Sequence, residues 1–331
     1  MNRIQLKLQS QQLSLDLGSL YTRVRLNGDL VFHQPTCLIK DKESSSVVNF
    51  GDKALELQDK MPPNTSLVFP IEKGVVADKA SLEAYLKIIL KKVDIPDLQV
   101  WLNLTKGEIA LPAEATRLDR KIFKSVLANV GLSKLDLKAN PEAIYQHWQE
   151  KGFVQADSSL LLIDLGSETA DLAVIVDGQI VKAFTLGFGS GQFTQVIKDW
   201  LEQEYQLKVG MKTAASVKRI LPDLFQDNKQ SLDKLNIRGV DLNDQLVLTK
   251  TVEISSLSPI FKNMAQELSR LIKLSLSQVK SGGLVEAVDN GLYLTGGGSH
   301  LSGLSELLGQ ELKTQAVVSS TSYFDTVNGL C

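Results

Sequence analysis

The sequence is poor in the residues that build disulfide frameworks and metal clusters. Its 331 residues include two cysteines, Cys37 and Cys331, and three histidines that are far apart from one another. Two distant cysteines exclude a disulfide scaffold, and isolated histidines exclude the common zinc-ligand spacings. This usage is typical of a reducing compartment, so we expect a cytoplasmic location.

An excess of positive charge and a long apolar run are also missing. The formal net charge is -2, so no basic field is available to hold a nucleic acid backbone. No stretch approaches the roughly 18 apolar residues of a membrane-spanning helix, and the N-terminus has no apolar core like that of a signal peptide. We therefore expect no nucleic acid partner and no membrane span. The 43% of apolar residues is enough to form the cores of two domains.

One internal repeat organises the chain. The segment LSLDLGS at 13–19 recurs as LLIDLGS at 161–167, which places Asp16 and Asp164 at the same position of each copy. Each copy consists of an apolar run, a turn at Asp-Leu-Gly-Ser and a second run that predicts a strand.

A hairpin signal follows the second strand of each copy, Asn27-Gly28 in the first and Asp177-Gly178 in the second. Such pairs favour type I′ turns, which need positive φ angles. Residues 23–26 alternate between charged and apolar and predict a half-exposed strand. Residues 172–176 are apolar throughout and predict a buried one.

Helical periodicity separates these strands. Apolar residues recur at helical spacing in 82–90 and 123–130, and further helices are predicted at 191–206, 211–221, 258–279 and 301–313. Strands alternating with helices in two similar halves predict an α/β fold with a cleft between the halves.

The predicted domain division follows the repeat. Domain I covers 1–139 and contains a small subdomain at about 33–77. Domain II covers 140–331 and contains a small subdomain at about 188–250, with the last residues returning toward domain I. Both small segments are rich in turn residues.

The repeated turn suggests phosphate binding. A strand that ends in a tight glycine turn presents backbone N–H groups that bind phosphate without a cation. A carboxylate at the turn suits Mg²⁺, so Asp16 and Asp164 are the predicted metal ligands. The alternative interpretation is an ordinary strand-end turn, since aspartate and glycine are common there. Duplication in matching context favours the phosphate interpretation.

A third glycine cluster, Gly296, Gly297 and Gly298, follows a predicted strand and precedes a predicted helix. Backbone without side chains allows a base or ribose to approach closely. Neither this cluster nor the glycines of 187–191 fits the Rossmann or P-loop spacing. Those two nucleotide folds are therefore disfavoured.

The order of these motifs resembles the superfamily of actin, sugar kinases and heat-shock chaperones, and within it the chain resembles MreB, the bacterial actin. Segments similar to MreB occur in order over nearly the whole chain, at 47–56, 62–65, 69–78, 189–193, 213–218, 237–241 and 294–303. The resemblance implies an actin-like, ribonuclease H-like fold of two duplicated domains. It also implies ATP and Mg²⁺ in the cleft and slow ATP hydrolysis coupled to polymerisation.

The resemblance further implies roles for individual residues. Gly18 and Ser19 would lie by the phosphates in the first turn, and Gly166, Ser167 and Thr169 in the second. Asp164 would help to place the attacking water, Lys218 would lie by the adenosine, and Gly296, Gly297 and Gly298 would line the base pocket. The implied partners are further copies of the chain in filaments of single or paired strands. The inner membrane surface, with cell-wall or division proteins, is the implied setting for a role in cell shape.

Several residues depart from the MreB pattern. Leu20 and Tyr21 are bulkier than the residues that usually follow the first turn, and Glu168 replaces a glycine in the second. The water-positioning acid is matched by Asn140, which cannot accept a proton. Glu142 is its candidate substitute, although a first-turn glutamate also suits the helix dipole. The ribose-binding acid is matched by Ala215.

Three functions remain open from the sequence. The first is a filament-forming ATPase that organises cell shape or the cell wall. The second is a scaffold of the same fold that does not hydrolyse ATP and recruits proteins, as FtsA-like and PilM-like relatives do; the departures favour it. The third, a small-molecule kinase, ranks last because no substrate-shaping insertion is visible.

Membrane contact through the N-terminus is a separate question. Apolar residues alternate with polar ones in residues 1–8, at Ile4, Leu6 and Leu8, and this pattern favours an edge strand over an amphipathic helix that binds a membrane.

Overall fold

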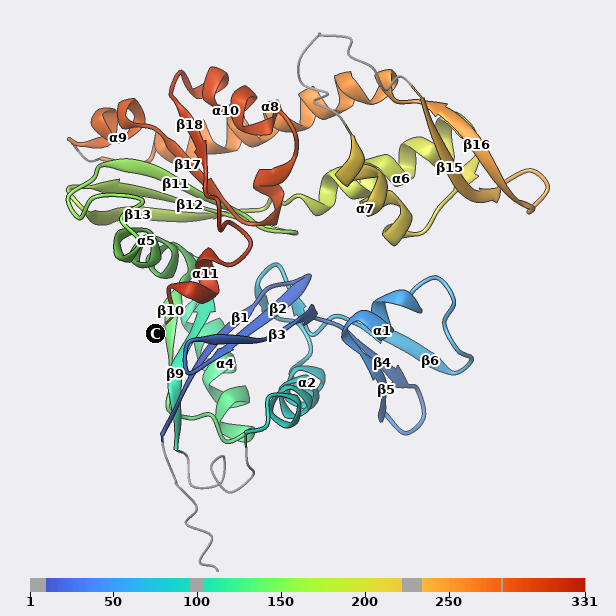
Figure 1. The fold of residues 1–331 in the computed structure, drawn as a ribbon, viewed down its shortest axis with the longest axis horizontal. Helices are drawn as coiled ribbons and strands as arrows, with labels where there is room; N and C mark the ends of the chain where they lie inside the picture. Colours follow the sequence, from blue (N-terminus) through green and yellow to red (C-terminus); the bar gives the residue numbers. More distant parts are fainter. Residues whose placement is uncertain (1–9, 96–103, 222–233, 281, 331) are drawn as a thin grey trace, which may run out of the picture. The chain divides into compact units, whose positions relative to one another are not determined.

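The computed structural model describes residues 10–95, 104–221, 234–280 and 282–330 (Figure 1). Contacts divide the chain into two compact units. Unit 1 comprises Met1–Phe153 with Phe324–Cys331, and unit 2 comprises Val154–Tyr323. The domain boundary expected at 139/140 and the limits of the two subdomains stay predictions.

Unit 1 is built on a five-stranded sheet with the order β3-β2-β1-β9-β10. Its strands are β1 (Gln11–Leu17), β2 (Tyr21–Leu26), β3 (Asp29–Pro35), β9 (Thr105–Leu111) and β10 (Leu135–Ala139). The first three form an antiparallel meander, and β9 and β10 pair in parallel beside β1.

Helices cover the sheet of unit 1. They are α2 (Lys79–Lys92), α4 (Arg117–Asn129), α5 (Asn140–Glu150) and the short α11 (Asp325–Asn328). The apolar faces of α2 and α4 pack in one core with Leu13, Leu15 and Leu17 of β1. The helix faces predicted at 82–90 and 123–130 are confirmed, because those apolar residues are buried. Figure 1 shows α11 against α5, where Trp148 Nε1 donates to Asp325 Oδ2 at 2.9 Å.

A smaller sheet lies within residues 33–77. It has the order β5-β4-β6, formed by β4 (Leu38–Asp41), β5 (Val47–Phe50) and β6 (Thr65–Val68), with α1 (Gly51–Glu56) packed on it. The two-residue strands β7 (Ile71–Glu72) and β8 (Val75–Val76) form a separate hairpin.

Unit 2 repeats the sheet of unit 1. Its strand order is β13-β12-β11-β17-β18, formed by β11 (Leu160–Leu165), β12 (Ala170–Val176), β13 (Gln179–Leu186), β17 (Leu292–Thr295) and β18 (Ala316–Val318). The first three strands are again an antiparallel meander, and the last two pair in parallel beside β11. The duplication read from two heptapeptides therefore extends to the topology of both sheets.

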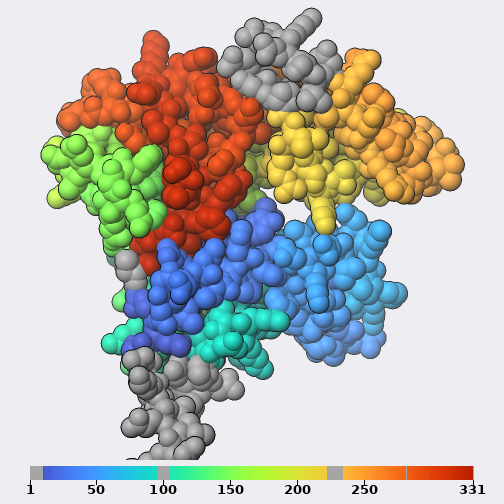
Figure 2. All heavy atoms as spheres, viewed as in Figure 1, coloured from blue at the N-terminus to red at the C-terminus, as the bar shows by residue number. Residues whose placement is uncertain are grey.

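The helices of unit 2 share one apolar core with its sheet. They are α6 (Gly191–Tyr205), α7 (Met211–Ile220), α8 (Ser258–Leu276), α9 (Leu284–Asn290) and α10 (Leu304–Leu312), with the 3-10 turns η1 (Ile254–Leu257) and η2 (Gly297–His300). A second small sheet has the order β14-β15-β16, with β14 (Leu207–Lys208), β15 (Lys234–Asp241) and β16 (Val247–Glu253). Figure 1 shows β15 and β16, in orange, at the end of unit 2 away from β13, in green, and Figure 2 shows the orange surface of the same segment.

The predicted hairpin turns are confirmed. Both residues of each turn have positive φ: 52° and 91° at Asn27 and Gly28, and 49° and 75° at Asp177 and Gly178. Strand β2 alternates in burial, and β12 is buried except at Val176, as the sequence predicts. The helix predicted at 301–313 is shorter, because η2 and a left-handed Gly303 precede α10.

Two observations bear on membranes. Residues 1–8, interpreted as an edge strand, lie outside the described residues. Within the part of the chain that the structure describes, no helix combines the length and the apolarity needed to cross a bilayer.

Candidate functional site

The two Asp-Leu-Gly-Ser turns have the same backbone. In unit 1, Gly18 N donates to Tyr21 O at 3.1 Å, and in unit 2, Gly166 N donates to Thr169 O at 2.9 Å. A Cβ on either glycine would press on that same carbonyl oxygen, at 2.8 Å and 3.0 Å. The close approach explains why both turns carry glycine.

Pairing in the sheets puts the two turn aspartates in equivalent places. Asp16 of β1 pairs with Arg23 of β2 on one side and with Ala110 of β9 on the other. Asp164 of β11 lies in the same way between Asp171 and Thr295. The residue opposite each aspartate is therefore an arginine in one unit and a second carboxylate, only 2% exposed, in the other.

The second turn is held in place by the glycine-rich segment 187–191. Ser190 N donates to Gly166 O at 2.9 Å, and Gly191 N donates to Ser167 O at 2.7 Å. A Cβ on Gly189 would collide with the Ser167 carbonyl. The 187–191 loop, which fits no common nucleotide motif, thus has a defined task as the support of turn two.

The 296–298 loop also packs closely against the start of turn two, at Asp164 and Leu165. Gly296 has φ 79°, and a Cβ there would strike the Asp164 carboxylate and the Leu165 carbonyl. A Cβ on Gly298 would lie 2.8 Å from the Cβ of Ser190. Glycine is required at both positions because three segments of main chain converge here.

One cation completes this cluster. Lys218, on α7, donates its Nζ to the Ser190 carbonyl at 2.8 Å. Burial, and secondarily the charge of Arg219, lower the pKa of Lys218 from 10.5 to about 8. The residues that the sequence assigns to phosphate, base and adenosine in domain II are therefore neighbours around a single strand end.

An aromatic pair borders the 296–298 loop. The ring of Tyr323 would lie 3.3 Å from a Cβ on Gly297, and the His300 ring stacks on it with a centroid distance of 4.4 Å. Tyr323 is 45% exposed. The sequence did not identify Tyr323, because nothing in its local pattern links it to a glycine loop that lies far before it.

The first turn has a different support. The Thr36 hydroxyl donates to Gly18 O at 2.7 Å and contacts the Thr22 hydroxyl at 2.9 Å. Ser19 Oγ accepts from Gly74 N at 3.0 Å, which ties the turn to the β7–β8 hairpin. The serine hydroxyl keeps its own proton to donate.

Asp16, a predicted metal ligand, is engaged by an arginine. Arg23 Nη1 donates to Asp16 Oδ2 at 2.9 Å, and the two side chains are 13% and 14% exposed. Burial raises the pKa of Asp16, while the charges of Arg23 and His33 oppose the shift. The pKa of His33 is lowered by burial and then by Arg23.

The two candidates for water positioning lie at the start of α5. Asn140 is its first residue, and Glu142 is exposed in its first turn. Glu142 Oε2 accepts the backbone N–H of Ala139 at 3.2 Å, closing half of a capping box. In this structure the Glu142 carboxylate therefore serves the helix end.

Comparison with known proteins identifies the family. The family model described as MreB/Mbl protein matches residues 10–331. The chain belongs to the MreB/Mbl family. It is similar to the cell shape-determining protein Mbl of Bacillus subtilis, with 26% identity over 311 residues that cover 94% of this chain and 91% of that protein.

Solved structures show the fold of this MreB/Mbl protein. Its structure is similar to that of MreB 5 of Spiroplasma citri bound to AMPPNP, with a TM-score of 0.86, 22% identity, and coverage of 96% of this chain and 94% of the other. The MamK double helical filament gives a TM-score of 0.73 at 15% identity, with coverage of 96% and 97%. The predicted actin-like α/β fold is confirmed.

The fit of Mg²⁺ differs between the two turns. Among the described residues, no group of three or more His, Cys, Asp or Glu side chains could hold a metal. Mg²⁺ bound with a nucleotide needs only one or two carboxylates, because phosphate oxygens and waters fill the other positions. Asp164 pairs with a second carboxylate residue, Asp171, in the sheet, whereas Asp16 pairs with Arg23 and forms an ion pair with it.

The positions that depart from the MreB pattern are accommodated locally. Leu20 and Glu168 occupy the same position of the two turns, and both are exposed. Tyr21 packs on His33, with ring centroids 5.1 Å apart. Ala215 lies on α7, one helical turn before Lys218.

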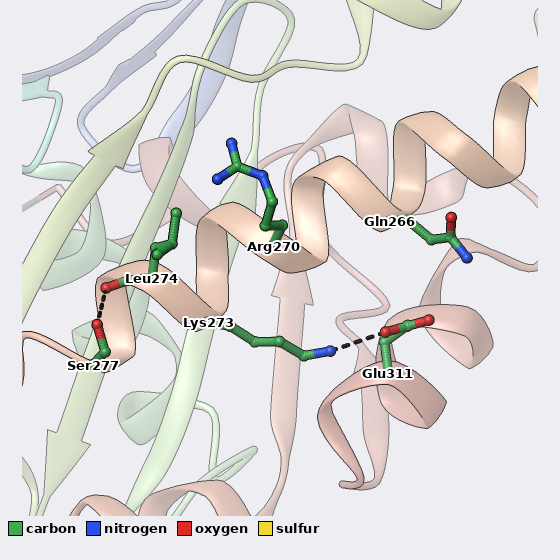
Figure 3. A pocket seen from close by; sticks show the side chains of 6 residues that line it. All are labelled: Gln266, Arg270, Lys273, Leu274, Ser277 and Glu311. Carbon is green, nitrogen blue, oxygen red and sulfur yellow. Dashed lines mark hydrogen bonds and ion pairs between the residues drawn. The ribbon is translucent and has the colours of Figure 1, made fainter.

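A surface groove elsewhere in unit 2 lacks the glycine-rich main chain of the candidate site. It lies between α8 and α10, has a volume of about 430 Å³ and is lined by six residues, Gln266, Arg270, Lys273, Leu274, Ser277 and Glu311. Figure 3 shows Lys273 of α8 reaching Glu311 of α10, at 2.9 Å. An exposed ion pair of this kind contributes little to the free energy of unfolding. None of the predicted site residues lines this groove.

The sequence reading missed Arg23 and Asp171. Each stands seven positions after the aspartate of its own turn. Aligning the two repeats through their hairpins would have found them, because residues opposite each other in an antiparallel pair share a face of the sheet.

Proposed function

We propose that this MreB/Mbl protein binds ATP and ADP at its glycine turns and assembles into filaments that organise cell shape at the inner face of the cytoplasmic membrane. The observation that carries the proposal is the convergence in unit 2 of turn two, the 187–191 loop and the 296–298 loop, with Lys218 beside them. Glycine at these contact points lets the three segments pack closely, and a cluster of main chain packed in this way supports a site that a ligand approaches through the backbone.

Each part of this cluster has a role in the proposal. Backbone N–H groups and the hydroxyls of turn two hold phosphate oxygens, as nests of main-chain donors do. The 296–298 loop, bordered by Tyr323, receives the base and ribose. Mg²⁺, when bound at Asp164, neutralises phosphate charge. That turn one of unit 1 grips the same polyphosphate stays a prediction from the sequence.

Three similar proteins support this assignment, because one binds a nucleotide, one forms a filament and one determines cell shape. MreB 5 of Spiroplasma citri is bound to AMPPNP, MamK forms a double helical filament, and Mbl of Bacillus subtilis is a cell shape-determining protein. We extend nucleotide binding, self-assembly and the cell-shape role to this chain on the strength of the shared family.

The melting temperature with and without ADP tests nucleotide binding. A ligand at 100 times its Kd adds about 2.7 kcal/mol to the free energy of unfolding, which is a clear shift. Gly298→Val should remove the shift, because its side chain would collide with Leu165 and Ser190 and displace the 296–298 loop. Gly282→Val is the matched control, since nothing lies within 4 Å of its Cβ position. A wild-type chain whose melting ignores ADP would overturn the nucleotide assignment.

A scaffold that binds nucleotide without hydrolysing it is the second candidate. Asn140 has no carboxylate, and Glu142 is engaged in capping α5, so neither offers a free general base at that helix start. Two measurements on the same sample incubated with ATP and Mg²⁺ separate the two functions: the release of phosphate, and the pelleting of polymer on centrifugation. Pelleting with release indicates a filament-forming ATPase, and pelleting without release indicates the scaffold.

A further inference from the structure

The first turn contains its own cation. Arg23 stands directly opposite Asp16 in the β1–β2 pairing, and its Nη1 lies 2.9 Å from Asp16 Oδ2. Both side chains are largely buried, at 13% and 14% exposure. A buried carboxylate requires a partner, and here the fold supplies it from the neighbouring strand.

Further contacts hold the arginine in place. The Arg23 guanidinium lies 5.8 Å from the centroid of the Phe324 ring, in cation–π range. Phe324 packs edge-on against His33 at 5.5 Å, and His33 packs against Tyr21 at 5.1 Å. Arg23 is therefore fixed by an aromatic cluster as well as by Asp16, which distinguishes it from a mobile surface arginine.

One donor of Arg23 is unused. Its Nε is buried and has no hydrogen-bond partner among the described residues. A guanidinium offers five N–H donors in a planar fork that suits phosphate oxygens. The pair thus satisfies Asp16 and keeps a buried Nε donor of Arg23 without a partner among the described residues.

We propose that Arg23 is the resident cation of the first turn and takes the place of a divalent metal at Asp16, so that Asp164 alone carries the metal dependence of nucleotide binding. This inference rests on the proposed nucleotide-binding function. Mg²⁺ gives up its waters reluctantly and needs available carboxylate oxygens. To bind Asp16 it would have to displace a buried arginine and leave that charge without its partner.

The test measures ADP affinity of the full chain by calorimetry, once with excess Mg²⁺ and once with EDTA. The ratio of the two dissociation constants is the magnesium effect. We expect Asp16→Asn to keep the magnesium effect within about twofold of wild type. Asp164→Asn should abolish it. Arg23→Leu should increase it by about tenfold or more, because Asp16 becomes free to bind the metal.

Two controls accompany these variants. Arg25→Leu removes an arginine of the same strand that bonds instead to Gly28 and Asn328, and it should keep the wild-type ratio. Arg23→Lys retains the positive charge and should change the ratio by less than about threefold. If Arg23→Leu does not fold, Arg23→Gln replaces it, because glutamine also removes the charge and should likewise increase the ratio.

The outcomes are distinct. Loss of the magnesium effect in Asp16→Asn, or an unchanged effect in Arg23→Leu, would overturn the role of Arg23 while nucleotide binding stands. If wild-type protein binds no ADP under either condition, the proposed function fails, and this inference fails with it.

Discussion

In unit 1 the turn carbonyl of Gly18 accepts a hydrogen bond from the Thr36 hydroxyl, whereas in unit 2 the carbonyl of Gly166 accepts one from the backbone N–H of Ser190. The two turns themselves close with the same glycine N–H bond. Their supports are thus a buried pair of threonines in one unit and a glycine-rich loop in the other. Equivalent backbones do not require equivalent surroundings.

The charges opposite the turn aspartates differ as well. The Asp16–Arg23 pair is formally neutral, whereas Asp164 faces Asp171, which accepts a hydrogen bond from Thr185 Oγ1 at 2.6 Å. A site with two carboxylates attracts cations, and one with an internal ion pair does not. The duplicated fold has the same turn hydrogen bond in both units and different charges opposite the turn aspartates.

The largest expected effect is at the loop that supports turn two. Gly189→Ala should lower the free energy of unfolding by about 3 kcal/mol, because the methyl group would collide with the Ser167 main chain. Gly187→Ala in the same loop meets nothing within 4 Å and should change it little. Urea unfolding of both variants measures the difference. Equal stabilities would mean that the loop does not press on the turn.

Removing the support of turn one should cost less. Thr36→Val loses the partly buried bond to Gly18 O and the buried contact with Thr22, and should destabilise the fold by about 1 to 2 kcal/mol. Thr36→Ser keeps the hydroxyl and is the matched control. Denaturation midpoints compare the two variants. A valine variant as stable as the serine variant would refute the role of this hydroxyl.

The pH dependence of stability tests Lys218, the cation that bonds to the loop supporting turn two. The pKa of Lys218 is about 8 in the folded chain, against 10.5 ordinarily. Between these pH values the unfolded chain binds more protons, so the free energy of unfolding should rise with pH through this window. Partial exposure screens the effect, which we expect to be about 1 kcal/mol. Lys218→Met should flatten this rise in pH-dependent urea titrations, and an unchanged slope would contradict the burial of Lys218.

The smallest effect is expected at the tips of the turns, where Leu20 and Glu168 are equivalent and exposed. Glu168→Leu should change stability by less than about 0.5 kcal/mol. It should strengthen ADP binding by about twofold, since a carboxylate near phosphate is removed. Calorimetry checks the affinity. Weaker binding in this variant would show that Glu168 contributes to the site.

Local chemistry made the fold predictable. Asn27-Gly28 and Asp177-Gly178 fix their turns through backbone sterics, and apolar periodicity located α2 and α4. The glycines of turn two and of 296–298, which the sequence assigns to a ligand, lie together in unit 2, and their role toward a ligand stays a prediction. Each of these features depends on residues close in sequence.

What the sequence could not give depends on pairing between distant residues. The engagement of Asp16 by Arg23 follows from the register of β1 and β2, and the capping role of Glu142 follows from where α5 begins. The 187–191 loop belonged to no recognised motif, because its task is to approach another stretch of main chain. Such roles appear only once the strands are aligned.

The most direct test of the division between the turns is a crystal structure with ADP and Mn²⁺, whose anomalous signal locates the metal. We predict ADP at the 296–298 loop, Mn²⁺ beside Asp164, and Arg23 still bonded to Asp16. Mn²⁺ bound to Asp16 with Arg23 displaced, or ADP absent from the 296–298 loop, would contradict the account.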